Sequence, residues 1–413
     1  MPISNIIFIK FDAMNGKMIL FKIATCLIFI AVFFCFNTAT SIAQQPTKIL
    51  LMDENVQFEA TEAVNNMYNF KFEKAEHDFL VLKQKYPTHP MPYFLMGMSN
   101  WWKIMPTLDT DMETYADVFI AYMDSTILYG EKLYDADEKN FEAAFFMSAA
   151  YGLKARYYGE KGKYGKATIN GKNALSYLQK YSNDNELSPE FLFGKSLFNY
   201  YAVWIYDNYT LLRPILAFFP KGNKEKGIKQ LKEVSYNAFY TRTEAQYFLM
   251  RIYGVEEEKE ELALPIARYL ATTFPDNAYF QRCFARYSFS QGQWTEAEKV
   301  SEDILYKLNI GMPGYEAISG RYASFYLGRI QMYKYHDYAK AKEYYYKTVK
   351  FAQETKATKM NYFLYALADL GKIADEEKQY DRARQYYQLV YKGTDKKDVL
   401  NKEAKLYLSK KKS

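Results

Sequence analysis

The sequence is poor in the residues that build disulfide scaffolds, metal sites and tight turns. Its 413 residues include three cysteines and three histidines. Three cysteines cannot form a disulfide framework, and three scattered histidines argue against a His-ligated zinc site. Glycine (19 residues) and proline (12 residues) are also scarce. That scarcity argues against an all-β protein with many tight turns.

Aromatic residues, by contrast, are abundant, with 41 tyrosines and 30 phenylalanines. Apolar residues make up 49% of the chain and charged residues 25%, for a formal net charge of +6. These fractions are ordinary for a folded protein and exclude wholesale disorder. The length fits two or three compact domains or one elongated array.

The N-terminal segment has the features of an export signal. Residues 23–36 (IATCLIFIAVFFCF) carry no charge, Lys17 and Lys22 precede them, and the small residues of Ser-Ile-Ala follow at 41–43. A basic region, a short apolar run and an A-x-A-like site are typical of a cleaved secretory signal peptide. We therefore expect residues 1–43 to be a signal peptide, with Met1, Met14 or Met18 as the start.

The same segment could instead remain as a membrane anchor, because about 20 apolar residues span a bilayer and the run nearly reaches that length. The short run and the good cleavage site favour cleavage. We then expect no integral membrane span in the mature chain, which would be periplasmic or associated with the cell envelope of a bacterium.

A repeated spacing of small and bulky residues runs through the rest of the chain. Near the C-terminus, Gly371 is followed twelve residues later by Ala383, then by Tyr387 and Val390. This spacing resembles the tetratricopeptide repeat (TPR), whose period is about 34 residues. Small residues at repeat positions 8 and 20 let two antiparallel helices approach, and the aromatic residue at position 24 fills the adjacent space.

The same frame recurs in units that start near residues 56, 90, 148, 187, 244, 278, 321 and 364. The resemblance implies an all-α fold, an α-solenoid of about eight TPR-like hairpins over residues 44–395. A non-repetitive helical bundle is the alternative. Residues 396–413 predict a polar capping helix with a Lys-rich end, because the terminal repeat of a solenoid needs a polar outer face.

Two of the units are stretched. The second contains a long helical region over residues 107–140, and the fourth carries an apolar insertion at residues 211–222 (LLRPILAFFPKG). The insertion could be a plug, a lid over a groove, a dimer contact or a segment packed inside the solenoid.

No catalytic motif is evident in the sequence. H-E-x-x-H, G-x-S-x-G, the P-loop and Rossmann glycine spacing are all missing. The acidic run at residues 256–261 is typical of a solvated helix start. We therefore expect no enzyme activity and no cofactor, and an exported protein is not expected to bind nucleic acid.

The TPR resemblance implies a concave binding surface lined by the first helix of each hairpin. Repeat position 9 is cationic in five of the eight units, and positions 2, 5, 12 and 13 add aromatic residues. The candidate partner-binding residues are Arg156, Lys195, Arg282, Arg286, Arg329, Lys372, Tyr279, Tyr322, Phe325, Tyr365, Trp101 and Trp102.

Such a groove predicts a non-enzymatic scaffold that holds a protein or peptide partner, and an acidic peptide would suit the arginine side chains. Alternatively, these cations pair with acids on neighbouring helices. A second class of function is a glycan or nutrient receptor resembling starch-binding proteins of the SusD type, which stack sugars on aromatic rings.

Overall fold

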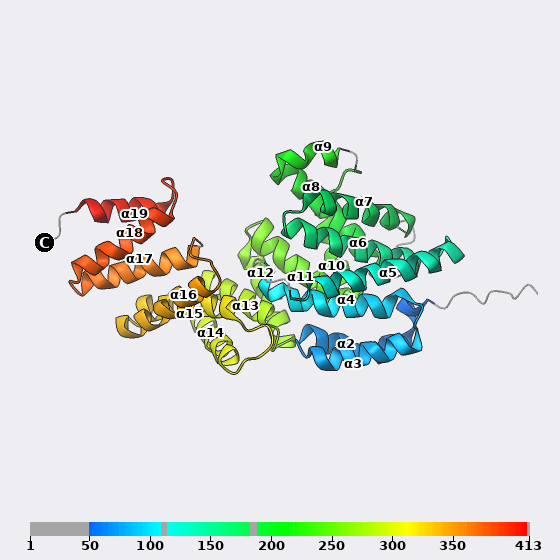
Figure 1. Ribbon diagram of the computed structural model, residues 1–413, viewed down its shortest axis with the longest axis horizontal. Helices are drawn as coiled ribbons and strands as arrows, with labels where there is room; N and C mark the ends of the chain where they lie inside the picture. Colours follow the sequence, from blue (N-terminus) through cyan, green and yellow to red (C-terminus); the bar gives the residue numbers. More distant parts are fainter. Residues whose placement is uncertain (1–48, 109–113, 182–187, 218, 360, 411–413) are drawn as a thin grey trace, which may run out of the picture. The chain divides into compact units, whose positions relative to one another are not determined.

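Helices pack in consecutive pairs through most of the chain. The computed structural model describes residues 49–108, 114–181, 188–217, 219–359 and 361–410. The predicted signal peptide therefore lies outside the described residues. Leu50–Ser413 form one unit, in which Figure 1 shows helices only within the described ranges.

Within those ranges the helices form eight hairpins. Their bounds are α2 (Glu54–Tyr68) with α3 (Phe72–Lys85), α4 (Pro90–Ile104) with α5 (Ala116–Ala136), α6 (Phe141–Glu160) with α7 (Tyr164–Tyr181), α8 (Pro189–Asn208) with α10 (Lys224–Asn237), α11 (Arg242–Arg251) with α12 (Glu260–Thr273), α13 (Ala278–Ser290) with α14 (Trp294–Asn309), α15 (Ala317–Tyr333) with α16 (Tyr338–Glu354), and α17 (Asn361–Glu376) with α18 (Tyr380–Gly393). The fold is an all-α solenoid, as predicted.

Five short elements and a last helix complete the described chain. Of the short helices, η1 (Leu50–Met52) precedes α2, η2 (Met105–Thr107) follows α4, η3 (Thr210–Leu212) follows α8, and α9 (Arg213–Leu216) forms part of the insertion. A π-helical turn, η4 (Ile252–Glu256), follows α11 directly. The last helix, α19 (Val399–Ser409), packs on α18 where a capping helix is predicted.

Local sequence signals place the helix ends. Asn140 caps α6 by accepting a hydrogen bond from the Ala143 amide, and Asn277 caps α13 by accepting from Phe280. Pro106 lies in η2 immediately after α4, which agrees with the inability of proline to continue a helix. The second unit differs from the prediction here, because α5 begins at Ala116 rather than continuing from residue 107.

The turns of most described hairpins repeat one backbone conformation. In six of the described hairpins a residue with positive φ lies between the two helices, as in the left-handed ends that commonly close helices. Glycine fills this place at Gly162 and Gly292. The residues at the other four turns are Phe70, Glu258, His336 and Lys378.

Close packing within the hairpins follows the small residues of the repeat. A Cβ atom added at Gly371 would lie 3.0 Å from the ring of Tyr387, and one at Gly328 would lie 2.6 Å from the ring of Tyr345. Ala383 and Ala341, both at or near position 20, have no exposed surface. This packing gives the chain a TPR-like fold.

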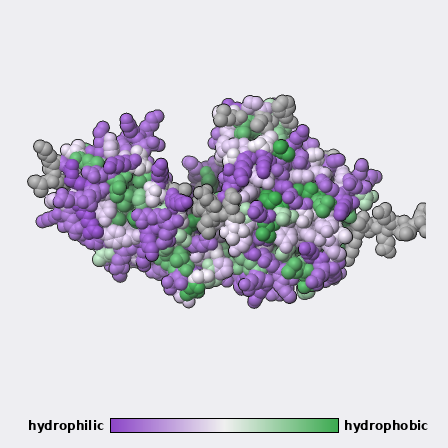
Figure 2. Space-filling view, viewed as in Figure 1, coloured by the Kyte–Doolittle hydropathy of each residue, from purple (hydrophilic) through white to green (hydrophobic). Residues whose placement is uncertain are grey.

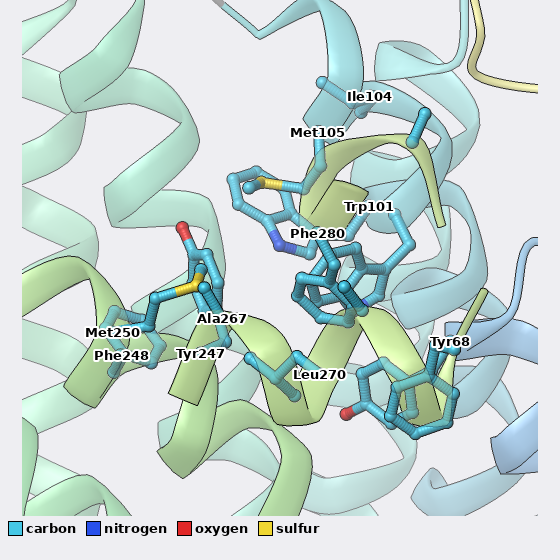
Figure 3. Close-up of a cluster of buried hydrophobic side chains, with 14 of the residues drawn as sticks. Tyr68, Trp101, Ile104, Met105, Tyr247, Phe248, Met250, Ala267, Leu270 and Phe280 are labelled. Carbon is cyan, nitrogen blue, oxygen red and sulfur yellow. The ribbon is translucent and has the colours of Figure 1, made fainter. Parts of the chain in front are cut away.

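The first hairpins also contact helices far along the chain. The Nε1 of Trp102 donates to Glu244 at 2.8 Å, and the Nδ2 of Asn277 donates to the Tyr68 carbonyl at 2.8 Å. Figure 3 shows Trp101, Tyr68 and Phe280 in one buried cluster. Helices α2 and α4 therefore pack against α11 and α13, and aromatic side chains fill the space between them.

Apolar side chains lie mostly in this interior. Hydrophilic residues cover most of the face shown in Figure 2, with smaller hydrophobic patches among them. No helix among the described residues is both long enough and apolar enough to cross a membrane.

Candidate functional site

Three of the predicted groove cations form ion pairs with acids, most of them on neighbouring helices. Arg286 pairs with Glu260 at 3.0 Å, and Arg329 pairs with Asp369 at 3.1 Å. Lys372 lies 3.3 Å from Glu403 and 3.5 Å from Asp369. These contacts match the alternative in which the cations pair with acids on neighbouring helices.

Asp369 is the most connected of these acids and has no exposed surface. It accepts hydrogen bonds from Arg329, from the Tyr333 hydroxyl at 2.9 Å and from the Tyr345 hydroxyl at 3.0 Å. A buried carboxylate needs such partners, because an unpaired buried charge is costly. The predicted cation at Arg329 therefore helps to join α15 to α17.

Arg282 and Lys195 lie in different surroundings. Arg282 donates to the Pro106 carbonyl at 2.9 Å and lies 5.7 and 5.8 Å from the rings of Tyr279 and Tyr322. Burial and the nearby Lys226 lower the pKa of Lys195.

The prediction that Trp101 and Trp102 are exposed rings is wrong. Both are 0% exposed. Trp101 packs against Phe119 of α5 and Arg156 of α6, and Trp102 packs against Tyr247 of α11 and Phe280 of α13. Phe325 is likewise buried at 4%, whereas Tyr279, Tyr322 and Tyr365 are half-buried. The sequence could not show the burial of Trp102, because the helices that cover it come from distant repeats.

The structure instead contains an apolar cavity that the sequence analysis missed. Its volume is about 610 Å³, within the range of small-molecule sites. Residues of α4, α6, α7, α8 and α11 line it. Of the twelve predicted site residues, Arg156 alone is among the described residues that line this cavity.

Small residues keep one side of this cavity open. On α6 they are Ala149, Gly152, Ala155 and Gly159, and on α7 they are Ala167, Gly171 and Ala174. A spacing of three or four residues places each set on one helix face. A Cβ atom added at Gly152, Gly159 or Gly171 would meet nothing within 4 Å. This periodicity is the signal by which the sequence could have revealed the cavity.

Aromatic residues and the insertion form the opposite side. Helix α8 contributes Phe193, Phe198, Tyr201 and Trp204. The insertion contributes Leu212, Leu216 and Phe219. The insertion therefore borders a ligand-sized space, which is compatible with a lid, one of the four alternatives considered for this segment.

A polar wall of the cavity comes from residues 240–256 and the facing Arg156. Arg156 is half-buried and is one of the residues that line the cavity. Its guanidinium carbon lies 4.9 Å from the ring centre of Trp101 and 5.0 Å from that of Phe248. Its Nη2 donates to the Tyr247 hydroxyl, and its buried Nη1 has no partner among the described residues.

The acids of this wall have donors of their own. Glu256 accepts from Arg251 at 2.9 Å and from the Tyr201 hydroxyl at 3.1 Å. Glu244 accepts from Trp102 and from the Tyr68 hydroxyl at 3.2 Å. Burial raises the pKa of Glu244, although the Trp102 hydrogen bond and the charge of Arg156 oppose that shift.

No group of three or more His, Cys, Asp and Glu residues in the described part of the chain could hold a metal ion. Cys283 is a free thiol, and burial raises its pKa to about 11. Its thiolate, the nucleophilic form, is therefore disfavoured.

Comparisons with known proteins give distant likenesses. Neither a protein-family model nor a curated protein matches the chain. The human IFIT1 dimer with PPP-AAAA is similar at 13% identity and a TM-score of 0.41, over 78% of this chain and 69% of that one. Yeast Tom70 is similar at 12% identity and a TM-score of 0.37, over 86% and 80%. The TPR domain of P58(IPK) is similar at 15% identity and a TM-score of 0.24, over 87% and 100%.

These likenesses are too distant to say what this chain binds. The helix pairs, the repeated left-handed turns and the glycine–tyrosine contacts define the fold by themselves. The chain is a TPR-like helical-repeat protein that encloses an apolar cavity.

Proposed function

We propose that this protein is a non-catalytic binding protein of a bacterial cell envelope that takes an apolar ligand into the cavity between α6, α7 and α8. A helical-repeat scaffold suits this role, because its preformed surface needs little ordering on binding. The envelope location rests on the export signal predicted for residues 1–43, and N-terminal sequencing of the mature protein would test it.

The glycines of the cavity carry this proposal. Gly152, Gly159 and Gly171 lie inside helices, where glycine costs about 0.5–1 kcal/mol relative to alanine. Elsewhere in the chain a helical glycine offsets this cost by allowing close packing, as Gly328 does against the Tyr345 ring. At the cavity the three glycines face open space, so their effect is to preserve room rather than contact.

Binding of the neutral fluorescent probe N-phenyl-1-naphthylamine to the full chain would test the cavity. We expect saturable binding that weakens at least about 10-fold in Gly171→Leu and Gly152→Leu, because each side chain would enter the cavity. Gly165→Leu is the matched control, since Gly165 also lies on α7 and meets open space but does not line the cavity.

Equal binding by the wild type and all three variants would refute the cavity as the site. The same conclusion would follow if the wild type bound no probe. Each variant replaces a helical glycine with a better helix former, so loss of folding is not the expected cause of lost binding.

A second candidate is the predicted scaffold for a protein or peptide partner. It is supported by Arg286 and Lys372, whose side chains remain 40% and 36% exposed despite their ion pairs. A partner recovered from an envelope extract by the wild type and lost with Arg286→Glu would support this role. Recovery unchanged by the substitution would argue against it. The SusD-like alternative is weaker, because Trp101 and Trp102 offer no exposed surface.

A further inference from the structure

The size of the cavity suits a small molecule. Its volume of about 610 Å³ lies within the range of about 300–1,000 Å³ that is typical of small-molecule sites. A flexible hydrocarbon chain can use such a volume fully.

Three residues of the cavity lining carry a buried polar atom without a hydrogen-bond partner in the part of the chain that the structure describes. Arg156 Nη1, the Tyr240 hydroxyl and Glu256 Oε2 are buried without hydrogen-bond partners among the described residues, and all three residues line the cavity. Buried polar atoms are normally hydrogen-bonded, so atoms without partners indicate where a ligand group can bind. Two of these three groups, the guanidinium and the hydroxyl, are hydrogen-bond donors.

The cavity lining carries Glu160, Glu244 and Glu256 beside Arg156 and Arg251, and Arg156 is the cation of this set without an ion pair among the described residues. Arg251 is paired with Glu256 at 2.9 Å and with Glu160 at 3.6 Å. Arg156 has no carboxylate within ion-pair distance in the described part of the chain, and its other polar contact is the neutral Tyr247 hydroxyl. An arginine so placed gains most from a carboxylate, because charge-assisted hydrogen bonds are stronger than neutral ones.

We propose that the cavity binds a long-chain fatty acid, an assignment that rests on the proposed function. The carboxylate would bind Arg156, and the hydrocarbon chain would lie between the small residues of α6 and α7 and the rings of α8. The Tyr240 hydroxyl is a second unpartnered donor in the cavity lining, among the described residues. An arginine without an ion pair among the described residues, in a mostly apolar lining, suits a monoanion with one long hydrocarbon chain.

Displacement of N-phenyl-1-naphthylamine from the full chain by oleic acid and by oleyl alcohol would test this assignment. The two ligands share one chain and differ in the head group. We expect the wild type to bind the acid about 10- to 100-fold more tightly, as a charge-assisted hydrogen bond allows. Equal displacement by the two ligands would overturn the proposal, and this comparison needs no variant.

Arg156→Met then tests which residue holds the carboxylate. We expect this variant to bind the acid no more tightly than the alcohol, while its affinity for the alcohol and the neutral probe stays unchanged. Arg156→Lys should retain part of the preference for the acid. A preference that survives in Arg156→Met would overturn the assignment of the head group to Arg156.

Two further outcomes separate this proposal from the one that it rests on. If the neutral probe binds and Gly171→Leu blocks it, yet the acid has no advantage, the cavity is a site and the fatty-acid assignment is wrong. If an apolar peptide with a free C-terminal carboxylate displaces the probe better than oleic acid, the ligand is a protein segment and the proposal fails.

Discussion

Two glycine-to-alanine substitutions should change stability in opposite directions. At Gly328 on α15, the added Cβ would lie 2.6 Å from Cε1 and 2.7 Å from Cδ1 of Tyr345. At Gly152 on α6, the added Cβ would meet nothing within 4 Å. Both glycines lie inside helices, so both substitutions gain the same intrinsic helix propensity and differ in packing alone.

The magnitudes follow from those two terms. Alanine gains about 0.5–1 kcal/mol over glycine in a helix interior, so Gly152→Ala should raise the free energy of unfolding by that amount. Overpacking at Gly328 costs about 1–3 kcal/mol, because the fully buried Tyr345 ring has little room to move. Gly328→Ala should therefore lower the free energy of unfolding by about 1–2 kcal/mol after the propensity gain is subtracted.

Urea unfolding followed by far-UV circular dichroism would measure both changes. Repeat arrays can lose two-state cooperativity, so amide hydrogen exchange in α6 and α15 would report the local effect alongside the global one. A stabilised Gly328→Ala variant would refute the described contact between α15 and α16. A destabilised Gly152→Ala variant would show that α6 is not open to the cavity at that point.

Three further predictions address the buried polar and aromatic groups. Trp102→Ala should cost about 3–5 kcal/mol in urea unfolding, because Trp102 is fully buried, and a silent substitution would contradict its placement. Asp369→Ala should cost about 3–5 kcal/mol by stranding Arg329, whereas Glu377→Ala, which breaks a more exposed pair, should cost under about 1 kcal/mol; equal costs would contradict this reasoning. Burial raises the pKa of Glu244, so its stabilising contribution is present below the unfolded pKa and lost as pH rises through the folded pKa. Glu244→Gln should therefore gain stability relative to the wild type as pH rises above the unfolded glutamate pKa of about 4.3, and a pH-independent difference would argue against that shift.

The repeated hairpins could be predicted because their contacts are local. Gly371 and Tyr387 are separated by only sixteen residues and meet inside one hairpin, so their spacing already encodes the contact. The groove cations were harder to interpret. The repeat frame gave Arg329 its place on a first helix, but its partner Asp369 is a separate residue forty positions later.

The apolar cavity of the candidate site could not be predicted from the sequence. The small residues of α6 and α7 show a helical period in the sequence, yet small residues also mark close packing, and the two cases look alike there. Gly152 and Gly328 are told apart only by what faces them.

The sequence by itself determined the helices, their pairing and the turns, because these depend on neighbours within one repeat. The tertiary structure decided what lies inside the array. Trp102 and Glu244 are 142 residues apart, and their contact buries a residue that the repeat frame placed on an open surface. The cavity arises in the same way, because its walls come from repeats that share no local spacing rule. Only the packed chain shows which small residues have neighbours and which leave room for a ligand.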